Sequence, residues 1–272
     1  MNRFCKKLKK QQQTNHSLLC IGLDTDRKKI PAHLLASDDP VFEFNKAIID
    51  TTADLVCAYK PNSAFYEAEG AKGLESLKKT CDYIHQQYPA IPIILDAKRA
   101  DIDSTNQGYI RMAFDYLKVE AMTLHPYLGK EALTPFLSLK DKFFFILCRT
   151  SNPGAGEFQD LTVGRQKLYE VVAQKVVQDW NTNNNCGLVI GATYPDELAK
   201  IRKTYKDVFI LIPGLGSQGG DAQKTIKAAR KNFIINVSRD IIYAGSHQNF
   251  QDLVRQKAKQ YRALINKTII SL

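Results

Sequence analysis

Long apolar runs are missing from this chain. No stretch approaches the roughly 20 apolar residues that a membrane-spanning helix requires. The apolar run nearest the N-terminus, residues 18–23, stops at Asp24 and is too short for a secretory signal. We therefore expect a cytoplasmic protein that does not bind a membrane.

Motifs for metals and for nucleotides are missing as well. The six cysteines have no C-x-x-C spacing, and no two histidines stand at the spacing of a metal site. No G-x-G-x-x-G follows the first apolar run, and G-x-x-x-x-G-K-[ST] does not occur. We expect no bound metal, and cysteines that are buried free thiols in a reducing compartment. These cysteines are Cys5, Cys20, Cys57, Cys81, Cys148 and Cys186.

Acidic residues are outnumbered by basic ones. The chain has 38 Lys and Arg against 28 Asp and Glu, which gives a formal net charge of +10. An excess of this size favours an anionic partner but does not name it. A nucleic-acid-binding module would interleave Lys and Arg with exposed aromatic residues. We do not find that pattern, so we expect no binding of nucleic acid.

The apolar residues instead recur in eight short runs, each of which ends in polar residues. Such continuous runs suit parallel strands that are covered on both faces. The expected strands are residues 18–23, 55–59, 91–95, 121–124, 143–148, 187–190, 208–212 and 233–237. Apolar spacing of three and four predicts helices between them, among others at residues 42–53, 73–88, 105–117, 161–180 and 196–205.

This alternation predicts an α/β fold, a single (β/α)8 TIM barrel of the phosphate-binding type. The length of 272 residues fits one such domain over residues 1–272. An open doubly wound sheet shows the same alternation, but its glycine-rich nucleotide turn is missing here. In a barrel, the functional residues gather where the strands end.

Charged residues follow two of the expected strands. Asp96 and Lys98 end the third strand two positions apart, and hence on one face, and Asp101 follows in the loop. Lys60 ends the second strand. A lysine between carboxylates stays protonated, which suits a proton donor better than a Schiff-base nucleophile. A surface ion-pair ladder is the simpler alternative. Two lysines and several aspartates at the strand ends of one barrel favour an active site.

The last two strands indicate an anion site. The glycine-dense segment 213–220 begins at Pro213, follows the seventh strand and precedes an expected helix, while Ser238 and Arg239 follow the eighth. Barrels commonly build phosphate sites from these two loops, with backbone N–H groups and a basic side chain. A tight glycine turn beside a surface arginine is the alternative.

At this point the motifs resemble a known family. Residues 96–102 are similar to the D-x-K-x-x-D signature of the orotidine 5′-phosphate decarboxylases, with Ala100 where a glycine is expected. Residues 58–67, 149–154 and 191–195 resemble the longer bacterial subgroup of that family, and the resemblance runs from about residue 24 to residue 243.

The resemblance implies decarboxylation of orotidine 5′-monophosphate to UMP and CO2, the last step of de novo pyrimidine nucleotide biosynthesis. It implies no metal and no cofactor, with Lys98 stabilising the C6 carbanion and then protonating it. Asp96 and Lys60 of the same subunit, together with Asp101 of the partner subunit, complete the catalytic group. The enzyme is therefore expected to be a homodimer with shared active sites. The implied substrate-binding residues are Asp24, Lys60, Thr105 of the partner subunit, Ser151, Pro213, Gln218, Ser238 and Arg239.

Other functions stay open at this point. A related sugar-phosphate barrel would usually need a metal ion, and a Schiff-base aldolase would need a lysine without acidic neighbours. The role of His125, which ends the fourth strand, is also open between packing and catalysis. The loop after Pro213 and Gly214 is expected to act as a lid.

Overall fold

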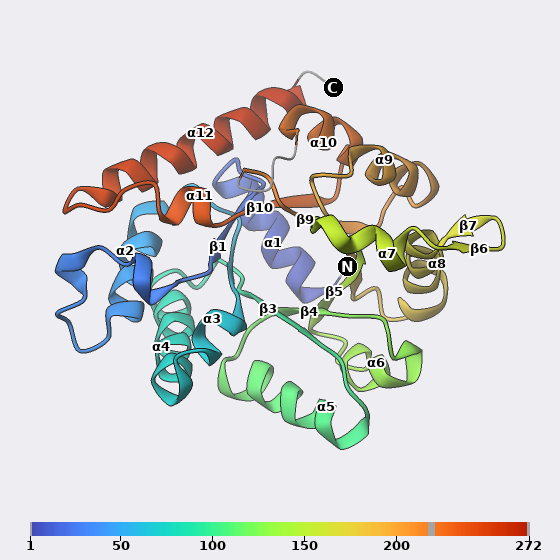
Figure 1. Ribbon diagram of the computed structural model, residues 1–272, viewed down its shortest axis with the longest axis horizontal. Helices are drawn as coiled ribbons and strands as arrows, with labels where there is room; N and C mark the ends of the chain where they lie inside the picture. The colour runs from blue at the N-terminus through green and yellow to red at the C-terminus, as the bar shows by residue number, and fades with distance from the viewer. Residues whose placement is uncertain (1, 217–220, 271–272) are drawn as a thin grey trace.

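Eight parallel strands form the centre of the protein. The computed structural model describes residues 2–216 and 221–270. The strands are hydrogen-bonded in the order β2-β1-β10-β9-β8-β5-β4-β3, and helices surround them (Figure 1). Their bounds are β1 (Leu19–Leu23), β2 (Ala58–Pro61), β3 (Ile94–Arg99), β4 (Ala121–Leu124), β5 (Phe143–Arg149), β8 (Cys186–Ile190), β9 (Phe209–Pro213) and β10 (Phe233–Val237).

The sheet closes on itself between its two outer strands. Isolated parallel bridges join Tyr59 to Ile93 and Asn62 to Asp96, which connects β2 to β3. The predicted (β/α)8 TIM barrel is therefore confirmed, and the open doubly wound sheet is wrong. The eight apolar runs became strands because closure buries both faces of each: β1, β8 and β10 are buried along their whole length.

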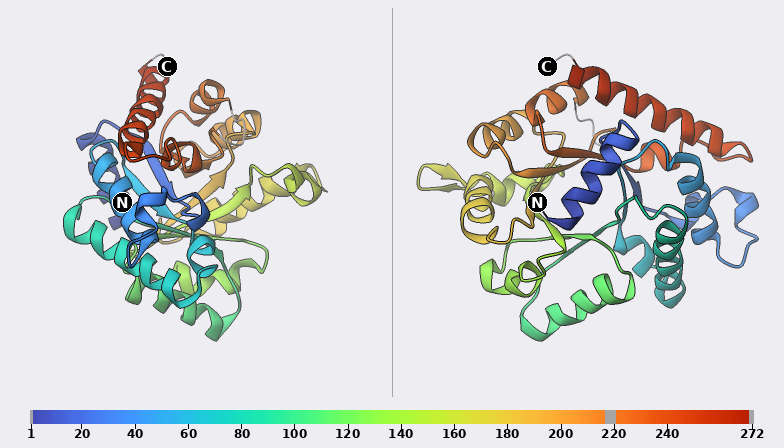
Figure 2. Two further views of the ribbon diagram at one scale, coloured as in Figure 1. Left: turned by 60° about the vertical axis from the view of Figure 1, so that its left-hand side comes forward. Right: turned by 180° about the vertical axis from the view of Figure 1, so that it is seen from behind.

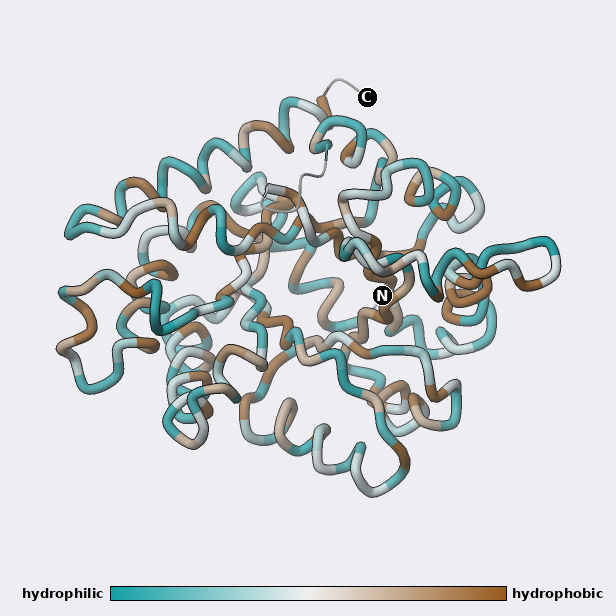
Figure 3. The backbone as a smooth tube through the Cα atoms, in the orientation of Figure 1, coloured by the Kyte–Doolittle hydropathy of each residue, from teal (hydrophilic) through white to brown (hydrophobic). Residues whose placement is uncertain are grey.

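Helices cover the outside of the barrel. Hydrophobic residues are concentrated toward the inside, and hydrophilic residues toward the outside (Figure 3). The principal elements are α2 (Pro40–Thr52), α4 (Gly70–Gln87), α5 (Asp103–Ile110) with the π-helical turn η3 (Arg111–Tyr116), α6 (Gly129–Leu137), α8 (Leu168–Gln174) with the π-helical turn η5 (Lys175–Trp180), α9 (Pro195–Thr204), α10 (Ala222–Ala229) and α12 (Phe250–Ile270). Short elements are η1 (Arg27–Lys29), η2 (Ala32–Leu34), α3 (Ser63–Glu67), η4 (Pro153–Ala155), α7 (Gly156–Gln159) and α11 (Arg239–Ile242). None of the described helices combines the length and the hydropathy of a membrane-spanning segment.

One expected helix is wrong at its start. Residues 161–180 were expected to be helical throughout, but β6 (Thr162–Val163) and β7 (Gln166–Lys167) form an antiparallel hairpin that extends from the body (Figure 1). Gly164 lies between them with a φ of 63°, a conformation that glycine adopts without steric cost. This turn overrides the helical spacing, and the helix begins only at Leu168.

The N-terminal helix α1 (Arg3–Thr14) closes one end of the barrel, as the view from behind shows (Figure 2, right). The Phe4 ring stacks on Phe143 at the start of β5, with 5.1 Å between ring centroids, and meets Phe145 edge-on at 5.9 Å. Leu8 is fully buried in the same cluster. Because these contacts are at the beginnings of the strands, the opposite end, where the strands finish, stays open.

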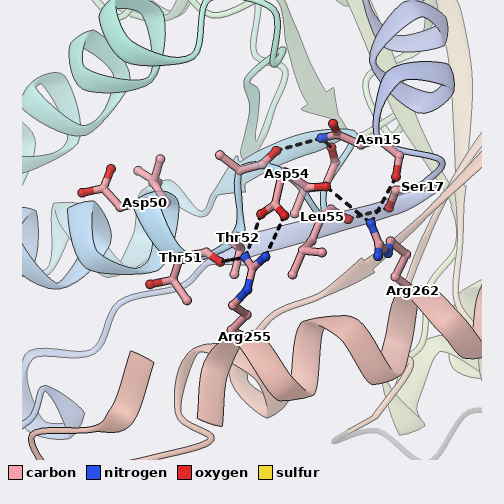
Figure 4. A network of polar contacts seen from close by, with 12 residues as sticks. Asn15, Ser17, Asp50, Thr51, Thr52, Asp54, Leu55, Arg255 and Arg262 are labelled. Carbon is pink, nitrogen blue, oxygen red and sulfur yellow. Dashed lines mark hydrogen bonds and ion pairs between the residues drawn. The ribbon is translucent and has the colours of Figure 1, made fainter. Parts of the chain in front are cut away.

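The long helix α12 is fixed to the region between α2 and β2 (Figure 4). The Arg255 guanidinium makes two hydrogen bonds to the Asp54 carboxylate, at 2.7 and 2.8 Å, and a third to the Thr51 carbonyl at 2.7 Å. Arg255 lowers the pKa of Asp54, although burial opposes the shift. Asn15, which follows α1, donates to the Ala53 carbonyl nearby. Both ends of the chain are thus attached to the same side of the barrel.

All six cysteines are buried free thiols, as predicted. Burial raises the pKa of the thiols of Cys20, Cys148 and Cys186 to about 12, so the neutral form dominates at neutral pH.

Phe4→Ala should lower the free energy of unfolding by about 3–5 kcal/mol, because the lost ring leaves a cavity against Phe143 and Phe145. Urea unfolding followed by circular dichroism measures the change. Lys10→Ala, on the exposed side of α1, is the matched control and should change stability by no more than about 0.5 kcal/mol. Equal stability of Phe4→Ala and the unsubstituted protein would show that α1 does not contribute to the cooperative fold.

Candidate active site

A cavity of about 670 Å³ opens at the C-terminal ends of the strands. Nearly every strand of the barrel contributes a residue at or just beyond its end, so the closed sheet brings together residues that are far apart in sequence. The sequence-predicted residues that line it are Asp24, Lys60, Asp96, Lys98, Ser151, Pro213, Ser238 and Arg239.

The Asp96 carboxylate lies between two lysines at the floor of this cavity. Its Oδ2 is 2.6 Å from the Lys60 Nζ, and its Oδ1 is 2.6 Å from the Lys98 Nζ. The Thr123 hydroxyl also donates to Oδ1, at 2.8 Å. Lys60 is only 2% exposed, whereas the Lys98 side chain is 48% exposed. The structure therefore brings the predicted charged residues together, and leaves Lys98 as the one of the two lysines that faces open space.

This arrangement determines which groups are ionised. Burial would lower the pKa of Lys60, but the carboxylates of Asp96 and Asp24 outweigh it and raise that pKa. Burial would likewise raise the pKa of Asp96, but Lys60 and Lys98 outweigh it and hold the pKa well below its usual range. At neutral pH the floor of the cavity thus holds a carboxylate between ammonium groups.

Lys98 reaches Asp96 through an irregularity in β3 rather than through a regular strand. The pairing of β3 with β4 shifts between Leu95 and Arg99, and Lys98 has a φ of 48°, in the left-handed region. The Lys98 amide donates to the Thr123 hydroxyl at 3.0 Å, which supports this conformation. The prediction that the two residues lie together is confirmed, but the two-residue repeat is not the reason. The register shift and the left-handed backbone at Lys98 bring its side chain to the carboxylate.

Two buried oxygen atoms in the cavity wall lack a partner among the described residues. They are Oδ1 of Asp24 and Oδ1 of Asn236. Buried acceptors are nearly always hydrogen-bonded, so both sites suit a ligand that carries hydroxyl or N–H donors. Sequence analysis missed Asn236, although a polar residue inside the apolar run of β10 is a signal that could have found it.

The loops that follow β9 and β10, where the sequence predicts an anion site, form one end of the cavity. Gly214 and Gly216 have φ values of 93° and 100°, which a side chain would strain. The Ser238 hydroxyl donates to the Gly22 carbonyl at 3.0 Å, and a Cβ at Gly22 would come within 2.7 Å of the Ser238 Cβ. Arg239 follows as the first residue of α11. Gln218, and with it most of the expected lid, lies outside the described residues.

Two predicted residues do not line the cavity of their own chain. Asp101 is half-buried beyond the end of β3, and its Oδ1 accepts from the Ile102 amide at 2.7 Å. Thr105 is exposed on α5. The described chain therefore does not bring them to Lys98, and their assignment to a neighbouring subunit stays a prediction.

His125 does not line the cavity either. It is half-buried, and its Nδ1 accepts from the Tyr127 amide at 3.3 Å. Ala100 is 7% exposed and packs in the core. Among the described residues, no group of three or more His, Cys, Asp or Glu side chains could hold a metal ion.

Known proteins resemble this chain over nearly its whole length. The model of the orotidine 5′-phosphate decarboxylase / HUMPS family matches residues 17–250. The orotidine 5′-phosphate decarboxylase of Azoarcus sp. is 46% identical over 267 residues, which are 97% of this chain and 98% of that protein. That of Herpetosiphon aurantiacus is 48% identical over 259 residues, 95% and 96% of the two chains. The solved structure of Leishmania donovani OMP decarboxylase has a TM-score of 0.86 at 35% identity, and the match covers 99% of this chain and 100% of the other.

Asp96→Asn should lower the free energy of unfolding by about 3 kcal/mol at pH 7, because it leaves Lys60 buried without its nearest carboxylate. A carboxyl group with a lowered pKa stabilises the fold above its unfolded pKa of about 4 and loses this effect as the pH falls further. The difference between the two proteins should therefore shrink below about pH 4. Urea unfolding at pH 7, 5 and 3.5 measures it, and a constant difference would contradict the lowered pKa of Asp96.

Proposed function

Since this chain belongs to the orotidine 5′-phosphate decarboxylase family, we propose that its cavity decarboxylates orotidine 5′-monophosphate without a metal or a cofactor. The observation that carries this proposal is the Asp96 carboxylate between Lys60 and Lys98, each 2.6 Å away. An electrostatic group of this kind, fixed before the substrate arrives, is what a reaction through a carbanion requires.

Loss of CO2 from C6 leaves a carbanion in the plane of the ring, where no neighbouring π system absorbs the charge. The protein must then stabilise that charge and supply a proton. Lys98 performs both steps in this proposal: its ammonium group attracts the developing charge and then protonates C6. Asp96 keeps the ammonium in place, and the buried Lys60 keeps Asp96 ionised.

The substrate extends from this charged floor toward the loops after β9 and β10. Arg239 and Gln218 hold the phosphate, and this binding energy helps to organise the reacting ring. Pro213 and Ser238 are further substrate-binding residues in the same two loops. Asp24 and Lys60 hold the ribose hydroxyls, which is supported by the unpartnered Oδ1 of Asp24 among the described residues. Ser151, in the loop after β5, hydrogen-bonds the edge of the pyrimidine.

The active enzyme in this proposal is a homodimer. Asp101 of the partner subunit faces C6, and Thr105 of the partner subunit contacts the ribose. Exposed apolar side chains in the loops after β3 and β4 support an interface there: Ile102 is 59% exposed, Tyr127 84% and Leu128 45%.

The whole chain works as one domain in the cytoplasm, on the same proposal. The α1 helix packs into the closed end of the barrel and α12 against its side, so the segments outside the family match share the core. The six buried free thiols suit a reducing compartment.

Purified protein should consume orotidine 5′-monophosphate in excess EDTA, as followed by ultraviolet absorbance. Lys98→Ala should lower kcat by at least about 10³-fold, because it removes both the stabilising charge and the proton donor. Circular dichroism should show that the variant is folded. Activity that EDTA abolishes and a metal ion restores would contradict the proposal and favour a metal-dependent sugar-phosphate enzyme.

Subunit mixing tests the shared site. Lys98→Ala and Asp101→Ala should each be nearly inactive, but their co-expressed mixture should regain about a quarter of normal activity, because half of the dimers are hybrids with one intact site of two. The matched control is Lys98→Ala mixed with Asp96→Asn, in which every hybrid site lacks one of the residues. Equal activity of both mixtures would show that Asp101 does not act across subunits.

A further inference from the structure

Arg149, the last residue of β5, is buried behind the wall of the cavity. It is 2% exposed and does not line the cavity, whereas the next three residues, Thr150, Ser151 and Asn152, do. We infer that Arg149 is a positioning residue, which acts through Gln159 and Thr150 to hold Ser151 against the pyrimidine ring. The inference rests on the proposed function, because that function places the pyrimidine beside Ser151.

The Arg149 guanidinium is held on two sides. One face stacks on the Tyr194 ring, with 3.7 Å between the guanidinium carbon and the ring centroid. Its Nη2 is 2.9 Å from the Asp160 carboxylate, and its Nη1 donates to Oε1 of Gln159 at 3.2 Å. These contacts fix the guanidinium plane, and with it the position of the Gln159 amide.

Gln159 in turn holds Thr150, the first residue of the loop after β5. Its Oε1 accepts from the Thr150 amide at 2.9 Å, and its Nε2 donates to the Thr150 hydroxyl at 2.8 Å. That hydroxyl in turn donates to the Asn152 side chain at 2.7 Å. Because Oε1 accepts from two donors, the orientation of the Gln159 amide is fixed. The backbone amide of Thr150 before Ser151 and the side chain of Asn152 after it are thus both held by hydrogen bonds.

The loop after β8 supports Ser151 from the other side. The Gly191 amide donates to the Arg149 carbonyl at 2.7 Å, and a Cβ at Gly191 would lie 2.6 Å from the Ser151 Cβ. The Thr193 hydroxyl donates to the Ser151 carbonyl at 3.4 Å. Tyr194, which stacks on Arg149, belongs to the same loop. Ser151, in the loop after β5, is therefore packed against the loop after β8, and Arg149 contacts both loops.

Stability alone does not account for this arrangement. Arg149 is buried and its partner Asp160 is half-buried. Replacing such a buried charge by an apolar side chain is often neutral or stabilising, so the burial of Arg149 points to a role in geometry. The chain offers a comparison in Arg202, which is also 2% exposed. Arg202 donates to the carbonyls of Val208 and Ala229, which precede β9 and β10 at the closed end of the barrel, away from the cavity.

Binding of UMP and of ribose 5-phosphate by the purified full-length protein, measured by isothermal titration calorimetry, separates positioning from general stability. Ribose 5-phosphate lacks the pyrimidine that Ser151 contacts. Arg149→Met and Gln159→Ala should weaken UMP binding by about ten- to hundredfold, a range typical of a misplaced contact, and leave ribose 5-phosphate binding unchanged. Arg149→Lys should restore part of the UMP affinity, because it keeps the charge but not the planar fork.

Arg202→Met is the matched control, and it should lower Tm without changing the ratio of the two affinities. Equal weakening of both ligands in the Arg149 and Gln159 variants, or UMP binding as tight as in the unsubstituted protein, would overturn the inference. If the unsubstituted protein bound neither ligand, the proposed function would fail, and this inference with it. Gln159 itself lines the cavity, so the variant that tests the inference where Arg149→Met does not fold is Arg149→Lys, which keeps the charge beside Asp160.

Discussion

The candidate active site depends on the buried carboxylate of Asp96 staying ionised. Asp96 is 9% exposed, and its two oxygens are shared by Lys60, Lys98 and Thr123. Lys60 is buried and would be costly to keep charged without the Asp96 carboxylate, and burial would favour neutral Asp96 without the two lysines. Because the three charges come from two strands, closure of the barrel between β2 and β3 is what assembles them. The contact between β2 and β3 that closes the barrel is therefore also the contact that brings Lys60 to Asp96.

The two ends of the barrel are held together by different kinds of contact. At the closed end, α1 fills the space between the strand beginnings with Phe4 and Leu8, and Arg202 binds backbone carbonyls. At the open end, glycines let loops approach one another, as Gly191 does beside Ser151 and Gly22 beside Ser238. Apolar packing therefore stabilises one end, while hydrogen bonds and charges shape the other.

Much of the fold could be predicted because most strand residues are buried on both faces of the sheet, so that the strands appear in the sequence as continuous apolar runs. The charged floor followed, since Lys60 and Asp96 end two such runs. The hairpin around Gly164 could not be predicted from helical spacing, because one glycine turn overrides it. The irregular backbone at Lys98 escaped prediction because it depends on Thr123, which is distant in sequence. The Arg149–Gln159–Thr150 contacts escaped it because they depend on how the loop after β5 folds back on itself. The assignments of Asp101 and Thr105 to a partner subunit remain predictions.

Carbon-13 NMR of protein labelled at the aspartate carboxyl carbons tests the central claim most directly. Asp96 is assigned by the signal that disappears in Asp96→Asn. We predict that this signal keeps the chemical shift of a carboxylate as the pH is lowered from 7 to about 4, where ordinary aspartates are already partly protonated. A titration of Asp96 with a midpoint near 4 or above would contradict the account, because the carboxylate would then not be held between two ammonium groups.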